Sequence, residues 1–129
     1  MVGPARTLDD YERKARTTAH DAQSVVETVL LIAETAAAGH AFGPFTGVSI
    51  SEQEDALAAV QGDFGSIQPP DERADALRAE LNELLSSAMD DIAAVRIAAR
   101  RGQASGLDDV AAPLADDSAA LDAFIESIS

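Results

Sequence analysis

Cysteine and tryptophan are both absent from the 129-residue chain. Without cysteine the protein has no disulfide bond, no thiol nucleophile and no thiolate ligand for a metal. This absence does not select a compartment, because a cysteine-free chain suits the cytosol as well as the outside of the cell. Any chemistry must therefore come from other side chains.

Basic residues are scarce. The chain has 9 Lys and Arg against 23 Asp and Glu, which gives a formal net charge of −14. Nucleic acids and anionic lipid surfaces are bound by cationic side chains, so we expect neither as a partner. A strongly acidic surface also favours a monomer or a weak homodimer.

Long apolar runs are missing as well. The most apolar stretch, Val29 to Ala33, is far too short to span a membrane and is flanked by Glu27 and Glu34. No secretory leader pattern is recognisable in these residues.

What the chain does have is alanine and helical spacing, with only 4% aromatic residues. Apolar residues recur at steps of three and four from Leu8 onwards and again after Asp71, which is the period of one helix face. Asp71 follows two prolines as a candidate N-cap, and Gly102 follows two arginines as a candidate stop. The pattern predicts two long helices, over about 8–38 and 71–101, with a thin core of small side chains.

Two shorter helices are expected between and after these. Gly39 to Ser49 contains three glycines and a proline, so it is interpreted as a loop whose phenylalanines are buried. Ser51 and Glu54 form a capping box that predicts a helix over about 51–64. The last helix, about 107–128, contains Pro113, which either kinks it or separates a first turn from a second helix.

These four segments with short connections predict one all-α domain over residues 1–129. Its expected architecture is an antiparallel up-down-up-down four-helix bundle with two long and two shorter helices.

That topology brings the ends of the first and third helices together. This end is a candidate site for a small carboxylate or phosphate ligand. Its candidate residues are His40, Phe42, Phe45, Arg96, Arg100 and Arg101. The interpretation that the sequence favours over this site is that the arginines only complement the helix dipole and pair with Asp108 and Asp109.

Other kinds of site find little support in the sequence. Helical di-iron sites use Glu-x-x-His motifs, and neither His20 nor His40 has a Glu three residues before it. Asp91 is the sole carboxylate on the apolar stripe of the third helix. His20 is expected to be exposed, and the acidic Asp21 beside it disfavours phosphotransfer. With no nucleophile motif, P-loop or zinc pattern, we predict no catalytic residue, no metal and no cofactor.

Three segments carry a family resemblance: AFGPFTGVSISEQEDA, GDFGSIQPPDERADALR and RIAARRG. They resemble an uncharacterised family of actinobacterial helical proteins. The resemblance implies an extracytoplasmic domain that is secreted or membrane-tethered through a leader absent from this sequence. No catalytic residue transfers with it.

The sequence thus predicts a non-enzymatic binding or interaction module, such as the extracytoplasmic sensor-like domain of an anchored protein. Its partner would be an unknown protein or a small anionic ligand. The alternative is a cytosolic structural or regulatory protein that homodimerises through the first helix.

Overall fold

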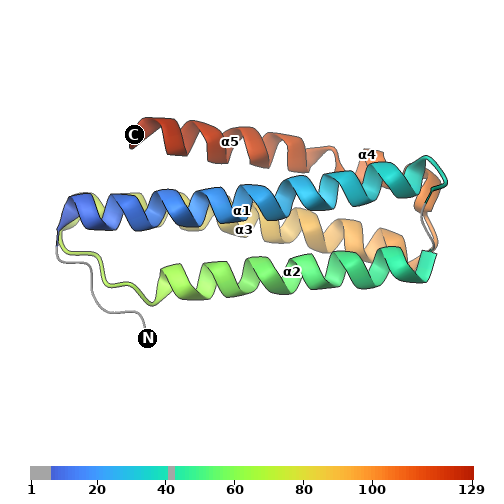
Figure 1. Ribbon diagram of the computed structural model, residues 1–129, viewed down its shortest axis with the longest axis horizontal. Coiled ribbons are helices and arrows are strands. Elements are labelled where there is room, and N and C mark those ends of the chain that lie inside the picture. Colours follow the sequence, from blue (N-terminus) through green and yellow to red (C-terminus); the bar gives the residue numbers. More distant parts are fainter. Residues whose placement is uncertain (1–6, 41–42) are drawn as a thin grey trace.

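The computed structural model describes residues 7–40 and 43–129, and within these ranges it contains helices and no strand. Three arms are single helices: α1 (Leu8–Ala37), α2 (Gly43–Gly65) and α3 (Glu72–Arg100). A 3₁₀ turn, η1 (Ala104–Gly106), leads to a fourth arm made of α4 (Leu107–Ala111) and α5 (Pro113–Ser127). Successive arms run in opposite directions (Figure 1), which confirms the predicted all-α up-down-up-down bundle.

Helices α1 and α3 occupy the middle of the bundle. α2 packs against both of them along one side, and α5 packs against both from the opposite side (Figure 1). Each of these helices also keeps one face exposed to solvent.

The ends of the two central helices follow the predicted signals. The side chains of Thr7 and Asp71 each accept a hydrogen bond from the N–H three residues further on, at 3.1 and 2.8 Å. After the helices, Gly39 and Gly102 take positive φ angles of 80° and 74°. Only glycine adopts this conformation without strain, which explains why both helices stop there.

Small side chains fill much of the core, as the composition predicts. The buried alanines are Ala15, Ala19, Ala22, Ala33, Ala36, Ala74, Ala88, Ala98 and Ala111. At the end of the bundle where α1 begins, the rings of Tyr11 and Phe64 pack with their centroids 5.5 Å apart. Alanine allows the helix axes to approach closely. Each of the few large residues buries more apolar area than an alanine does.

The predicted start of the second helix is wrong. α2 begins at Gly43 and not at Ser51, so it is a third long helix of 23 residues and the predicted capping box does not exist. Pro44 lies in the first turn, where the missing N–H of proline costs no intrahelical bond. Buried Thr46 and Ile50, four residues apart, extend the inward face that Leu57 continues. Their burial stabilises helix in a segment rich in glycine.

The fourth arm resolves the two alternatives for Pro113. α4 ends at Ala111, and α5 starts with Pro113 in its first turn. The chain therefore breaks here into two helices, and the arm still spans the predicted range of about 107–128.

Among the described residues, no helix combines the length and the apolar content that crossing a lipid bilayer requires. In the apolar stretch of α1, Val29 and Ala33 are buried in the bundle, whereas Leu31 is exposed.

Candidate functional site

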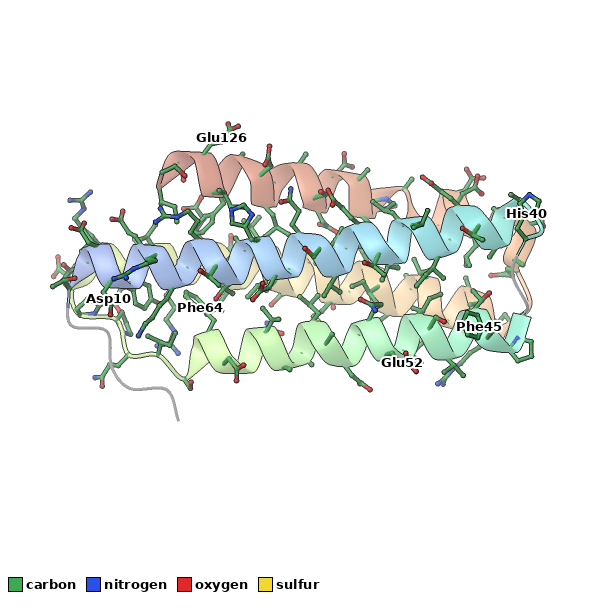
Figure 2. The ribbon with its side chains drawn as sticks, in the orientation of Figure 1. Asp10, His40, Phe45, Glu52, Phe64 and Glu126 are labelled. Atoms are coloured by element: carbon green, nitrogen blue, oxygen red, sulfur yellow. The ribbon has the colours of Figure 1, made fainter. Side chains whose placement is uncertain are left out.

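Three large apolar side chains are exposed at the end of the bundle where α1 finishes and α2 begins. Leu31 is 63% exposed, Phe45 68% and Val48 58%. We call these three residues the apolar patch. Figure 2 shows Phe45 on α2 near the same end as His40. The prediction that Phe45 is buried is wrong, because the segment it belongs to is a helix whose other face is turned inwards.

Helix geometry sets the direction of these side chains. Thr46 and Ile50 point into the core, and Phe45 and Val48 are three residues apart on the opposite face of α2. Leu31 lies likewise on the face of α1 opposite the buried Val29 and Ala33. The patch is thus formed by the outward faces of two neighbouring antiparallel helices.

A hollow of about 190 Å³ lies between the two helices within this patch. It is lined by Leu31, Ile32, Thr35, Phe45, Thr46 and Ser49. The hydroxyl of Thr35 donates a hydrogen bond to the backbone oxygen of Leu31 at 2.8 Å, so its polar group is turned to its own helix. An apolar cavity of ~150 Å³ is known to bind benzene. This hollow therefore has the volume for one large apolar side chain of a partner.

A second hollow, of about 630 Å³, lies on the other side of the same α2 ridge, against α3. It is lined by Pro44, Gly47, Val48, Ser51, Glu52, Asp55, Ala99, Arg100 and Gly102. Val48 thus borders this groove while Phe45 borders the hollow beside α1. The patch is a ridge with a depression on each flank.

Exposed carboxylates surround the patch. Glu52 and Asp55 continue the outward face of α2, four and seven residues after Val48, and both line the larger groove. Figure 2 shows Glu52 further along α2 than Phe45. On α1, Glu27 and Glu34 are exposed and lie one turn from Leu31 on either side. We call these four residues the acidic rim.

The residues predicted to form an anion site have different surroundings from one another. Arg96 donates from its Nε to Oε1 of Glu54 at 2.8 Å, in a pair that is mostly shielded from solvent. Arg100 lines the groove that also holds Glu52 and Asp55.

His40 and Arg101 are exposed and line neither hollow, and Phe42 lies outside the described residues. With two carboxylates beside Arg100 and one paired with Arg96, the local charge is unfavourable for an anion. The anion site stays a prediction that this geometry does not favour.

A buried carboxyl group on α5 was not foreseen. Asp117 is only 8% exposed, and its Oδ1 accepts a hydrogen bond from the Ser87 hydroxyl at 2.8 Å. Burial, followed by the neighbouring Asp91, raises the pKa of Asp117 to about 7. The missed signal is in the spacing, since Asp117 fills the step between Leu114 and Leu121 on the apolar stripe of this helix.

Asp91, predicted on the core stripe of α3, therefore has a partner across the bundle. In the described ranges, no group of three or more His, Asp or Glu side chains could hold a metal ion. His20 is exposed, as predicted. Burial next to Asp91 thus raises the pKa of Asp117 and favours its protonated form inside the bundle.

Comparison with models of protein families, with curated proteins and with solved structures finds no match to this chain. The family resemblance therefore stays a prediction.

Proposed function

We propose that this protein is a non-enzymatic interaction module that holds a protein partner on the apolar patch. The observation that carries the proposal is the exposure of Leu31, Phe45 and Val48 together at one end of the bundle. Single exposed apolar residues are common on soluble proteins, whereas grouped ones mark interaction sites.

The shape of the surface supports the same function. The 190 Å³ hollow is bordered by Leu31 and Phe45, which are two of the three patch residues. Aromatic and aliphatic side chains around a depression are typical of the centre of a protein interface, where a partner inserts an anchor residue. A hollow of about 390 Å³ at the other end of α2 is lined by Arg13, Lys14 and Asp63 as well as Phe64 and Ile67, and no exposed large apolar side chain borders it.

A peptide-display selection tests this proposal. The protein is immobilised, a library of random peptides is passed over it, and the enriched peptides are measured against three purified proteins. These are the wild type, the double variant Leu31→Ser with Phe45→Ser, and the control Ile97→Ser. Ile97 is also a partly exposed large residue, 41% accessible, but it lines neither hollow.

We expect peptides that share a motif with apolar anchors. Their affinity should fall at least tenfold with the double variant and stay within twofold with Ile97→Ser. Far-ultraviolet circular dichroism checks that each variant keeps its helix content. Enriched peptides that bind the double variant as well as the wild type would show that the patch is not the binding surface.

We propose further that the module works outside the cytoplasmic membrane in a sensor-like role, as the sequence resemblance implies, with the cytoplasm as the alternative. Cell fractionation with an antiserum to this chain tests the location. Recovery with a periplasmic, membrane or secreted fraction is expected, and recovery with a cytoplasmic marker enzyme would favour the alternative.

A further inference from the structure

We infer that the partner seated on the apolar patch is a basic amphipathic helix, and this inference rests on the proposed function. It places an apolar stripe of the partner against Leu31, Phe45 and Val48 and its Lys or Arg side chains against the acidic rim. Two features of the surface lead to it, the form of the depressions and the sign of the charge around them.

The depressions run along the seams between helices. The smaller hollow is bounded by α1 and α2, and the larger groove by α2 and α3. A groove between two antiparallel helices accepts the ridge of a third helix, with side chains three and four residues apart as anchors. Phe45 and Val48 are themselves three residues apart, which matches the spacing of the anchor side chains on a partner helix.

An added strand would not suit this surface, because it needs an open sheet edge to pair with. The described ranges contain helices and no strand, so they offer no such edge.

The charge around the patch selects a cationic partner. Four exposed carboxylates, Glu27, Glu34, Glu52 and Asp55, surround the three apolar side chains. Among the residues that the structure describes, Arg100 is the one cation lining either hollow. A partner with Lys and Arg beside its apolar stripe would gain attraction on the rim and fast association at low salt.

The same charge disfavours a second copy of this chain. Two copies meeting through this end would bring two acidic rims together, each on a molecule of net charge −14. Like charges placed opposite each other in an interface are unfavourable. Homodimerisation through α1 is therefore the competing outcome that the experiment must separate.

The experiment uses two fluorescent synthetic peptides of about 18 residues, long enough to form a helix on binding. Both share the same Leu and Ala stripe at helical spacing. One carries Lys and Arg on its polar face and the other carries Glu. Binding to the full chain is measured by fluorescence anisotropy at low and at moderate salt.

Three variants accompany the wild type. Leu31→Ser with Phe45→Ser removes the anchor region. Glu52→Gln with Asp55→Asn neutralises two rim charges. The matched control, Asp122→Asn with Glu126→Gln, neutralises two exposed carboxylates on α5, far from the patch.

We expect the cationic peptide to bind at least tenfold more tightly than the anionic one. The anchor variant should lose at least tenfold in affinity. The rim variant should lose about threefold to tenfold and show a weaker salt dependence, whereas the α5 control should stay within twofold of the wild type.

Different failures point to different conclusions. If both peptides bind equally and the anchor variant weakens both, the patch is a docking site but the partner is not selected by charge, and only this inference falls. If the α5 control weakens binding as much as the rim variant, the attraction comes from overall charge and the rim assignment is overturned. If the anchor variant binds the cationic peptide with wild-type affinity, the peptide does not bind at the apolar patch.

Sedimentation velocity of the wild type and of Phe45→Ser tests whether a second copy of the chain occupies the patch. A monomer is expected for both. A wild-type dimer that Phe45→Ser dissociates would make a second copy the occupant and would overturn the inference.

Discussion

At the scale of single residues, the most unusual group is Asp117. Its side chain is enclosed between α5 and α3, and while Oδ1 receives the Ser87 hydroxyl, Oδ2 is buried without a hydrogen bond. A charged carboxylate is unfavourable there because it is cut off from water and lies next to Asp91. The folded protein therefore favours the protonated, neutral form.

This protonation predicts a specific pH dependence of stability. The pKa of Asp117 is raised from its ordinary value of 3.8 to about 7 in the folded state. Between these two values the folded state binds a proton that the unfolded chain has released. The free energy of unfolding contributed by this group should therefore fall as the pH rises from about 4 to 7, and stay constant above that range.

Asp117→Asn keeps the shape and removes the charge, so it should abolish this contribution. At pH 8 the variant should be more stable than the wild type by about 1–3 kcal/mol, the usual cost of an unsatisfied buried polar group. At pH 5 the difference should be much smaller. Urea unfolding at both pH values measures it, with the exposed Asp122→Asn on the same helix as the control. An equal difference at pH 5 and pH 8 would contradict the assignment.

At the scale of elements, α2 shows where sequence patterns fail. Glycine and proline between residues 39 and 49 indicate a loop when each is judged by its own propensity. In the fold, Pro44 occupies a harmless first-turn position, and burial of Thr46 and Ile50 outweighs the weak propensity of Gly47. Tertiary contacts of this kind are not visible to a local pattern.

The same limit of local patterns explains which features of the candidate site the sequence predicts and which it does not. The long regular stripes of α1 and α3, with their caps, were predictable because local signals and burial agree. The exposed patch was not, since it depends on the phase of the first turns of α2. The burial of Asp117 was predictable from its position on the stripe between Leu114 and Leu121. A stripe defined by apolar residues alone does not include an aspartate.

Gly47→Ala tests the helical state of the start of α2. A Cβ at this position would meet nothing within 4 Å, and Gly47 is not among the described glycines with positive φ. Alanine in a helix is favoured over glycine by roughly 0.5–1 kcal/mol, so the variant should be more stable by about that amount. Thermal and urea unfolding measure the change.

Gly39→Ala is the matched control for this substitution. Gly39 also has open space around it, but its φ of 80° strains any residue with a Cβ. It should lose about 1–2 kcal/mol. If Gly47→Ala were also destabilising, residues 43–50 would not be helical in solution.

At the scale of the whole molecule, the dominant property is charge. A net charge of −14 on 129 residues makes the folded state repel itself, since folding brings the carboxylates closer together. The three ion pairs found in the described part of the chain involve Arg13, Lys14 and Arg96, and the first two share Asp10. They compensate few of the carboxylates.

We therefore expect sodium chloride to stabilise the fold. Raising its concentration from about 0.02 to 0.5 M shortens the range of repulsion between carboxylates to a few ångströms. A gain of about 1 kcal/mol would raise the Tm by roughly 4 °C. Thermal unfolding at pH 7.5, followed by circular dichroism, measures it. Near the pI of about 4.2 the effect should vanish, and a Tm that falls with salt at pH 7.5 would refute the expectation.

The placement of the chain ends has a consequence for how the patch is presented. The first turn of α1 and the last turn of α5 meet at one end, where Leu8, Ser127 and Ile128 line a common depression and Arg16 donates to the Ile128 carbonyl oxygen at 2.9 Å. The apolar patch lies towards the other end, where Leu31 is about 35 Å along α1 from Leu8 at a rise of about 1.5 Å per residue. Anything joined to the protein at its first or last helical turn is thus separated from the apolar patch by most of the length of the bundle.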